Sequence, residues 1–387
     1  MSKKIFITSG GTGGHIIPAR CLAQYLGEQN HQIHFFGDIK IKGYIRSNDN
    51  FKSKIIQTSQ LQKSAIPLLK SAIKIATGII QGLWYFYKIR PDFIYAFGGY
   101  ASFPILVASL LFGCPIILHE QNAHLGKVNR IFAKFAWKIA TSFPQTSGIN
   151  DDLKNKIIHT GNPVREEILK LNEEEYKIPQ YSEQIHHGQN NKIDYNMILA
   201  SEFYDVVKRK EQINILILGG SGGAKIFSEI LPKAFFNLNE ETKKLLHITQ
   251  QCRQEHVDST INLYKSFNIN AQVSHFFENI ADILRDTHLV IARSGSSSLG
   301  EFCVAKKPMI LVPFALSADN HQYKNAQYVA QNGGAIIIEE KDFSINKVTD
   351  VIIQLLTSRK TLITMSQNCQ KLAIVKATYN LAKVIDY

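Results

Sequence analysis

Two glycine-rich turns, one in each half of the chain, constrain the fold more than any other feature of this sequence. The first, SGGTGGH (residues 9–15), follows the apolar run Lys4–Thr8, and the second, GGSGG (residues 219–223), follows Ile213–Leu218. A strand, a glycine turn and a helix-length segment form the opening of a Rossmann-like unit. Two such openings predict two Rossmann-like domains rather than one long sheet.

Short β-branched or aromatic runs alternate with helix-length amphipathic segments along most of the chain, which is typical of α/β folds with parallel sheets. We expect strands at residues 4–8, 32–36, 93–97, 115–119, 136–142, 213–218, 247–250, 288–292, 309–312 and 335–338. A helix is expected over Pro18–Glu28. The final segment, Ser358–Tyr387, is also expected to be helical, because its apolar residues recur mainly every three or four positions.

Composition narrows the classes of protein. The 387 residues are 45% hydrophobic and 20% charged, as in soluble globular proteins that bury substantial cores. A net charge of +12 favours polyanionic partners, whether nucleic acid, anionic lipid or phosphorylated substrates. The five cysteines include no CxxC pair, so neither a zinc site nor a disulfide framework is indicated, and a reducing cytoplasm is the default. The N-terminal apolar run is too short for a signal peptide.

The first glycine turn combines a phosphate cradle with a titratable side chain. Because the turn joins a strand to a helix, its backbone N–H groups and the helix dipole can face an anion with no side chain in the way. His15 stands directly at the turn. It either accepts a hydroxyl proton near pH 7 or only orients the loop, and both interpretations remain open.

Other polar motifs also follow predicted strands. They are GGYAS (98–102), HEQN (119–122) and RSGSSSLGE (293–301). Ligands of parallel sheets bind at the carboxyl ends of the strands, so GGYAS is expected to face the same crevice as the first glycine turn. The four polar side chains of HEQN, where a buried strand meets a loop, are expected to belong to a site rather than to packing. Two anion-binding turns there imply a diphosphate or two phosphorylated ligands. Glu301 either accepts hydrogen bonds from two ribose hydroxyls or serves the helix dipole.

Taken in order, these motifs resemble the MurG family. The matching positions are GGTGGH (10–15), GGYAS (98–102), HEQN (119–122), Gly126 with Asn129-Arg130, GNPVR (161–165), GGS (219–221), RSG (293–295) with Glu301, and Asp319 with Gln322 and Asn325-Ala326. An ordered series of this length is far more specific than any single glycine loop.

The resemblance implies an α/β, GT-B architecture, with two Rossmann-like domains whose parallel sheets face each other across a cleft. It implies an acceptor and membrane-associating domain over residues 1–163 and a UDP-sugar-binding domain over 164–364. A polar insertion occupies about 172–212, where we expect a solvated surface segment and assign no function. A C-terminal helix over 365–387 is free to pack back on the first domain.

The activity implied by the resemblance is that of an inverting glycosyltransferase, a hexosyltransferase of bacterial cell-wall synthesis, which serves cell shape and division. It moves N-acetylglucosamine from UDP-N-acetylglucosamine to the 4-hydroxyl of undecaprenyl-diphosphate-linked N-acetylmuramyl-pentapeptide (lipid I to lipid II). The implied partners are these two substrates and an anionic membrane surface, with no nucleic acid. The implied location is the cytoplasmic face of the inner membrane, with peripheral attachment. No DxD pair presents a metal site, so no metal or other cofactor is expected.

The resemblance also assigns residues to roles. The donor-site positions are Thr12, Gly13, Gly14, Asn122, Arg165, Ser221, Phe277, Ser296, Ser297, Ser298, Leu299, Gly300, Glu301 and Gln322. Among these, Glu301 would hold the ribose, Ser221 would face the diphosphate, and Gln322 with Asn122 would read the sugar. The acceptor diphosphate would fall to Gly11, Gly98, Gly99 and Tyr100. His15 is the candidate base, and Glu120 is its alternative.

The chain departs from the family pattern at three places near the donor. Gly222 stands where glutamine is usual, residues 247–250 read HITQ in place of an HQ-x-G turn, and Phe277 stands where isoleucine is common. These differences bear on the details of the donor loops.

Residues 68–87 predict a helix with two apolar stripes. One stripe comprises Leu69, Ala72, Ile73, Ala76, Ile80, Leu83 and Tyr87, and the other comprises Leu68, Ile75, Ile79 and Phe86, with Lys70 and Lys74 beside it. One stripe is enough to pack a helix on its own domain. We expect the second stripe, with its lysines, to lie at an anionic membrane surface, the alternative being a helix buried on both sides. The most apolar stretch, Phe103–Leu118, is shorter than the ~20 residues needed to cross a bilayer.

Three other functions compete with this interpretation. A different GT-B transferase would use a UDP-sugar on another lipid. A basic nucleic-acid-binding protein fits the charge, but no basic helix with interleaved base-reading side chains appears. A nicotinamide oxidoreductase would leave the second glycine cradle and Glu301 without a role, although Asp38 stands near the position of its ribose-binding carboxylate.

Overall fold

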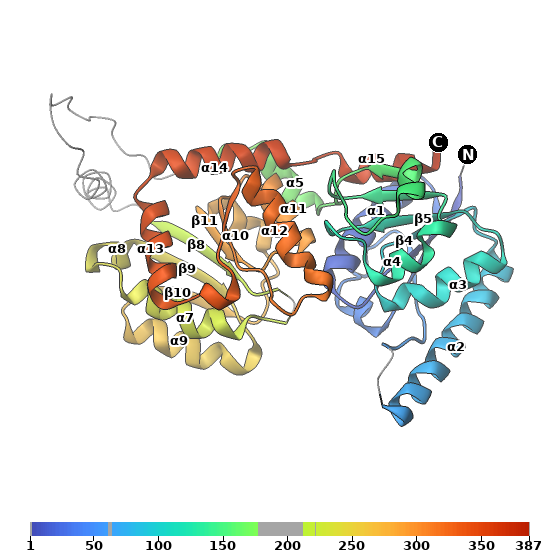
Figure 1. Cartoon of the computed structure of the whole chain (residues 1–387), viewed down its shortest axis with the longest axis horizontal. Helices are drawn as coiled ribbons and strands as arrows, with labels where there is room; N and C mark the ends of the chain where they lie inside the picture. Colours follow the sequence, from blue (N-terminus) through green and yellow to red (C-terminus); the bar gives the residue numbers. More distant parts are fainter. Residues whose placement is uncertain (1, 61–63, 177–211, 221, 387) are drawn as a thin grey trace. The chain divides into compact units, whose positions relative to one another are not determined.

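The computed structural model describes residues 2–60, 64–176, 212–220 and 222–386 (Figure 1). The chain divides into two compact units, each built around one parallel sheet. Unit 1 comprises Met1–Glu166, Gly295–Glu301 and Ile374–Tyr387, and unit 2 comprises Glu167–Ser294 and Phe302–Ala373. The prediction of two Rossmann-like domains is confirmed. Most of the predicted insertion, together with Ser221, lies outside the described residues.

The sheet of unit 1 has the order β3-β2-β1-β4-β5-β6-β7, with every described pair parallel. Its strands are β1 Lys4–Thr8, β2 Gln32–Gly37, β3 Lys52–Ile55, β4 Phe93–Ala96, β5 Ile116–Glu120, β6 Lys138–Thr141 and β7 Ile157–His159. The chain runs outward from β1 in one direction and resumes at β4 on the other side of β1. The carboxyl ends of β1 and β4 therefore form a topological switch point, where ligands of such sheets bind.

The sheet of unit 2 repeats this plan in the order β10-β9-β8-β11-β12-β13, again with parallel pairs. Its strands are β8 Ile213–Leu218, β9 Leu246–Gln251, β10 Asn270–Ser274, β11 Leu289–Ala292, β12 Met309–Leu311 and β13 Ala335–Ile337. Its switch point lies between β8 and β11. The GGSGG and RSGSSS segments follow these two strands directly.

Helices cover both sheets (Figure 1). They are α1 Gly13–Glu28, α2 Ala65–Ile89, α3 Phe103–Leu111, α4 Lys127–Phe132, α5 Glu166–Leu169, α7 Lys225–Phe236, α8 Glu240–Leu245, α9 Val257–Ser266, α10 Ile280–Asp286, α11 Ser296–Val304, α12 His321–Gln331, α13 Ile345–Leu356, α14 Arg359–Leu372 and α15 Ala377–Ala382. In unit 1, Ile5 and Ile7 of β1 face a core cluster with α1, whereas Phe6 faces a second cluster with Phe86 of α2. This alternation follows from the period-two geometry of a strand.

The predicted strands are all present, with shifts of a few residues at their ends, but β3, β7 and β10 were missed. The C-terminal segment is helical, as predicted, and its last part packs on unit 1, but it forms two helices rather than one. Helix α14 ends at Leu372 and belongs to unit 2, whereas Ile374–Tyr387 belongs to unit 1 and contains the separate helix α15. The buried Tyr95 hydroxyl donates to the Leu381 carbonyl at 3.0 Å and fixes this last segment on unit 1.

The face of α2 that was predicted to contact the membrane is the face that packs on its own domain. Phe86, assigned to the membrane, is fully buried, and Ile75 and Ile79 are half-buried. The reason is that Gly78 and Gly82 lie on the same face: a Cβ at Gly82 would be 3.0 Å from Ala108 Cβ of α3, and one at Gly78 would collide with the Gln57 carbonyl. Small residues let this face approach the domain closely, which leaves the first stripe outside.

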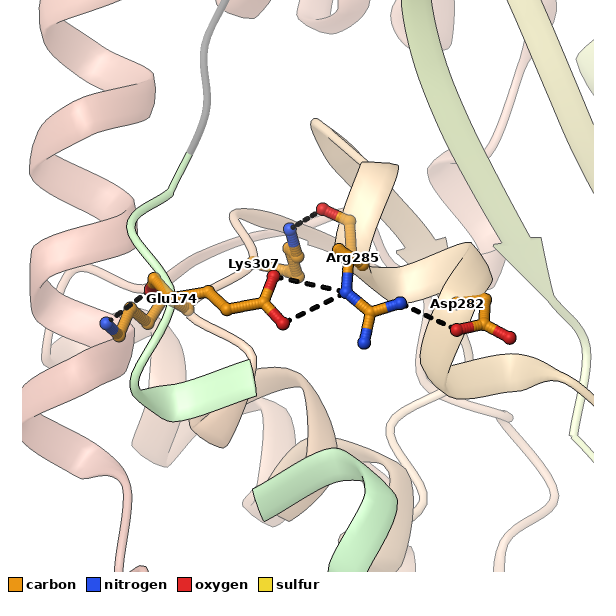
Figure 2. Close-up of polar contacts among 5 residues, drawn as sticks. Glu174, Asp282, Arg285 and Lys307 are labelled. Atoms are coloured by element: carbon orange, nitrogen blue, oxygen red, sulfur yellow. Dashed lines mark hydrogen bonds and ion pairs between the residues drawn. The ribbon is translucent and has the colours of Figure 1, made fainter. Parts of the chain in front are cut away.

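The segment before the undescribed residues 177–211 is fixed to unit 2 by a polar cluster (Figure 2). The Arg285 Nε donates to the Glu174 carboxylate at 2.9 Å, and its Nη1 donates to Asp282 at 2.6 Å. The Tyr176 hydroxyl donates to the His288 carbonyl at 2.5 Å, and His288 Nδ1 accepts from the N–H of Asn214 at 3.0 Å. Both described ends of the gap therefore lie at the amino ends of β8 and β11, opposite the switch point.

Candidate active site

The two glycine turns of unit 1 are in direct contact. Gly99 has φ +75°, and a Cβ there would lie 2.5 Å from the Gly10 carbonyl oxygen and 3.4 Å from His15 Cδ2. A Cβ on Gly10 would in turn collide with Ala101 Cβ. The turns approach this closely only because both lack side chains. The structure thus brings together GGTGGH, GGYAS and His15 at one edge of the sheet, although they are far apart in the sequence.

Asp38 braces the first turn. Its Oδ1 accepts from the Gly11 N–H at 3.4 Å, its Oδ2 accepts from the Tyr100 hydroxyl, and Lys40 Nζ donates to the Gly11 carbonyl at 3.0 Å. Burial, with a further contribution from Asp38, raises the pKa of Tyr100. The Asp38 carboxylate is thus engaged within the protein, which weakens the dinucleotide alternative. The contact of Lys40 with the turn was not predicted from the sequence. Its position just after the second predicted strand is the only sequence feature that could have indicated it.

His15 lies in the first turn of α1 and is half-buried. Its Nδ1 is 2.7 Å from Gln121 Oε1, and the Gln121 amide nitrogen is 2.9 Å from Nδ1 of the fully buried His119. His119 Nε2 is 3.1 Å from the Gly161 carbonyl. Burial is the main cause that lowers the pKa of His119, to about 4. The HEQN motif therefore supplies a contact to the candidate base that sequence reasoning did not identify.

Glu120, the alternative base, is almost fully buried and organises the loop after β5. Its carboxylate accepts from the Asn122 N–H at 3.0 Å, the Asn122 side chain at 3.1 Å, the Gly126 N–H at 2.8 Å and the Asn129 side chain at 2.8 Å. A carboxylate that already accepts four hydrogen bonds is poorly placed to take a proton from a substrate hydroxyl. The geometry favours a structural role for Glu120 and for the Asn122 amide bonded to it.

The glycine turn of unit 2 precedes α7 and contains two glycines at positive φ, Gly220 at +77° and Gly223 at +61°. The Gly223 N–H donates to the Gly220 carbonyl at 2.9 Å and closes the turn. Arg253 Nε donates to the Gly222 carbonyl at 3.0 Å and brings a cation to it. The contact of Arg253 was also not predicted. Arg253 follows the HITQ segment, where the sequence departs from the family pattern, so no motif pointed to it.

The RSGSSS segment, which follows β11 at the switch point of unit 2, is hydrogen-bonded to the start of α12. The Ser294 hydroxyl donates to the Gln322 carbonyl at 2.8 Å, and the buried Asn325 amide donates to the Ser294 carbonyl at 3.1 Å. The Gln322 side-chain oxygen accepts from the Phe314 N–H at 2.9 Å, so that one side of its amide is engaged. Phe277, a further predicted donor contact, is half-buried in the loop after β10.

Helix α11 presents the serines and Glu301. Ser296, Ser297 and Leu299 are buried, whereas Ser298 and Gly300 are partly exposed. The Glu301 carboxylate accepts a bidentate pair from Arg165, with Nε and Nη2 each at 2.7 Å. The two residues come from GNPVR and RSGSSSLGE, so two predicted donor-site motifs meet here. Thr12, at the N-cap of α1, is exposed, and Gly13 and Gly14 begin that helix.

Across the described part of the chain, no group of three or more His, Cys, Asp or Glu side chains is arranged to hold a metal ion.

Comparisons with known proteins show the family and the fold of the chain. Residues 5–141 match the N-terminal domain of glycosyltransferase family 28, and residues 214–382 match its C-terminal domain. A relative from Rickettsia rickettsii (strain Sheila Smith) is 34% identical over 371 residues, 95% of each chain. Its name is UDP-N-acetylglucosamine–N-acetylmuramyl-(pentapeptide) pyrophosphoryl-undecaprenol N-acetylglucosamine transferase.

A relative of the same name from Wolbachia pipientis wMel is 34% identical over 381 residues, 98% of each chain. The crystal structure of Acinetobacter baumannii MurG superposes with a TM-score of 0.72 at 25% identity and covers 99% of both chains.

The role of Glu120 can be tested with Glu120→Gln. The substitution places an NH₂ group against backbone and side-chain donors, so we expect the free energy of unfolding in urea to fall by about 1–3 kcal/mol. Glu28→Gln, at the exposed end of α1, is the matched control and should change it little. A Glu120→Gln protein of unchanged stability that has lost all activity would instead identify Glu120 as the base.

Proposed function

The chain belongs to the MurG family within glycosyltransferase family 28, and on this premise we propose how its residues carry out the reaction. The protein is a UDP-sugar-dependent hexosyltransferase of peptidoglycan synthesis. It transfers N-acetylglucosamine from UDP-N-acetylglucosamine to undecaprenyl-diphosphate-linked N-acetylmuramyl-pentapeptide. The assignments of residues, membrane contact and cofactor that follow are proposals.

The observation that carries the mechanism is the contact of the two unit 1 turns beside His15. Gly98, Gly99 and the backbone of Tyr100 offer N–H groups at a switch point, which suits the acceptor diphosphate, whereas the N–H of Gly11 donates to Asp38 and has a structural role. The Tyr100 hydroxyl itself bonds Asp38 and has a structural role. His15 then takes the proton of the muramyl 4-hydroxyl as that oxygen attacks the anomeric carbon, which inverts its configuration.

The donor nucleotide is assigned to the unit 2 turn and to α11. Arg253 at the turn and the N–H groups of Gly219, Gly220 and Gly222 would face the diphosphate, and Ser221 would add a hydroxyl. Glu301 keeps its assignment to the ribose hydroxyls, which requires Arg165 to release one carboxylate oxygen. Gln322 keeps its assignment to the sugar, whereas the Asn122 amide donates to Glu120 and is assigned a structural role. Dipoles and cations of this kind stabilise a departing UDP without a metal ion.

Membrane contact is assigned to the outer face of α2. Ile73, Ile80 and Tyr87 are 58%, 67% and 70% exposed, and Lys70 and Lys74 are exposed beside them. Among the described residues, one helix, Ile66–Ile89, is long and apolar enough to cross a membrane by length and composition. Because its other face packs on α3, we favour an in-plane position at the cytoplasmic surface of the inner membrane.

Transfer should be independent of added metal and should depend on His15. Purified protein in detergent is given radiolabelled UDP-N-acetylglucosamine and a short-chain lipid-linked muramyl-pentapeptide, and label is followed into the lipid fraction. We expect EDTA to leave the rate unchanged and His15→Ala to lower it about 100-fold or more, because general-base catalysis is lost. Loss of transfer in EDTA would refute metal independence. Near-normal turnover of His15→Ala with donor binding intact would refute the base.

Binding to liposomes that contain anionic phospholipid tests the membrane face. Ile73→Ser combined with Ile80→Ser should weaken partitioning about tenfold or more, since two large apolar side chains no longer enter the interface. UDP affinity should not change, which shows that the fold is kept. Ile353→Ser, at an exposed isoleucine on α13 of unit 2, is the control. Unchanged liposome binding of the double variant would contradict this assignment.

A further inference from the structure

A chain of hydrogen bonds runs from the interior of unit 1 to His15. It starts at the Gly161 carbonyl, passes through the His119 imidazole and the Gln121 side-chain amide, and ends at His15 Nδ1. His119 and Gln121 are buried and have no part in the mechanism described above. The direction in which each group donates can be worked out from the partners.

The protons on His119 are fixed first. Its Nε2 lies 3.1 Å from the Gly161 carbonyl, which can only accept, so Nε2 carries a hydrogen. Burial lowers the pKa of His119 to about 4, so the ring is neutral near pH 7. Its Nδ1 is therefore a lone pair that accepts a hydrogen bond.

The orientation of the Gln121 amide follows from two acceptors on His119. The amide nitrogen lies 2.9 Å from His119 Nδ1 and 3.2 Å from the His119 backbone carbonyl. Oxygen in that place would face two acceptors, so the NH₂ group must point to His119. The Gln121 oxygen consequently points to His15.

His15 is constrained in its turn. Its Nδ1 lies 2.7 Å from the Gln121 oxygen, which can only accept, so Nδ1 carries the hydrogen. A neutral imidazole has one N–H group, which leaves the lone pair on Nε2. Cδ2, the ring atom bonded to Nε2, lies on the side of Gly99 and the second turn.

We propose that Gln121, oriented by His119, is a positioning residue that fixes His15 in the tautomer whose Nε2 accepts the proton of the acceptor hydroxyl. This inference rests on the proposed role of His15 as the base. In the transfer, the proton moves from the 4-hydroxyl to Nε2 while the oxygen forms its bond to the anomeric carbon. The bond to UDP breaks, and its electron pair leaves with the diphosphate. The protonated ring keeps its Nδ1–H bond to Gln121 and later releases the Nε2 proton to solvent.

The tautomer can be observed directly by ¹⁵N NMR of the ring nitrogens in full-length protein labelled at histidine. His15→Ala identifies the His15 signals, and the exposed His275 serves as a reference in the same sample. We expect a protonated Nδ1 and a bare Nε2 for His15 in the wild-type protein, and loss of this preference in Gln121→Ala. A wild-type His15 that carries its proton on Nε2 would overturn the proposal whatever the activity.

Kinetics test whether the tautomer matters for transfer. Gln121→Ala should lower kcat about tenfold or more and change the KM for UDP-N-acetylglucosamine less than about threefold. Because loss of a buried amide also destabilises the fold, Gln121→Glu is the second variant. Its negative charge favours protonated His15, so the acid limb of the kcat–pH profile should move to higher pH, which a purely structural role would not cause.

Two outcomes separate this inference from the proposed function. An unchanged pH profile in a folded Gln121→Glu enzyme, with His15→Ala inactive, would overturn the positioning role and leave His15 as the base. A fully active His15→Ala enzyme would overturn the base and the positioning role together.

Discussion

The contact between the glycine turns after β1 and β4 is the constraint on which the rest of unit 1 depends. Gly99 can approach the Gly10 carbonyl only at positive φ and without a Cβ. This approach places the start of α1, and therefore His15, beside the second turn. Asp38 accepts hydrogen bonds from Gly11 and Tyr100 and so links the same two turns. Backbone sterics thus bring the proposed base and the proposed anion-binding turns together.

Both units use the same physical solution at their switch points. In each sheet, the two strands that flank the switch end in glycine- or serine-rich turns that open helices. In each unit, a long basic side chain bonds a carbonyl of the turn: Lys40 at Gly11 and Arg253 at Gly222. Such a side chain satisfies the turn and adds positive charge where an anion would bind.

Much of the framework could be predicted from sequence, because buried parallel strands are short apolar runs and their turns are rich in glycine. Strands β1 and β8 have the predicted bounds. Strand β3 was missed because its KSKI sequence is exposed and carries two lysines, and β7 and β10 are likewise poorly buried. A strand can be recognised from its sequence only where it is buried, because only a buried strand needs a run of apolar residues.

The errors and omissions have a common cause, which is tertiary contact. The face of α2 that packs on α3 was misassigned because only large apolar residues were counted, whereas Gly78 and Gly82 decide which side approaches the domain. The motif HEQN was predicted to form part of a site, but the role of each of its residues depends on partners that are distant in the sequence. Glu120 bonds Asn129, and Gln121 bonds His15. No spacing rule in the sequence reveals those pairings.

The central claim is that transfer depends on the close approach of the two unit 1 turns, and Gly99→Ala tests it most directly. The matched control is Gly43→Ala, at a glycine in the same unit where a Cβ would meet nothing within 4 Å. Transfer rate, UDP affinity and thermal unfolding are measured for both variants. The account predicts that Gly99→Ala keeps UDP affinity within about threefold and loses about 100-fold or more in transfer rate, because small displacements of reacting groups are costly. A Gly99→Ala enzyme that transfers as fast as Gly43→Ala would contradict it.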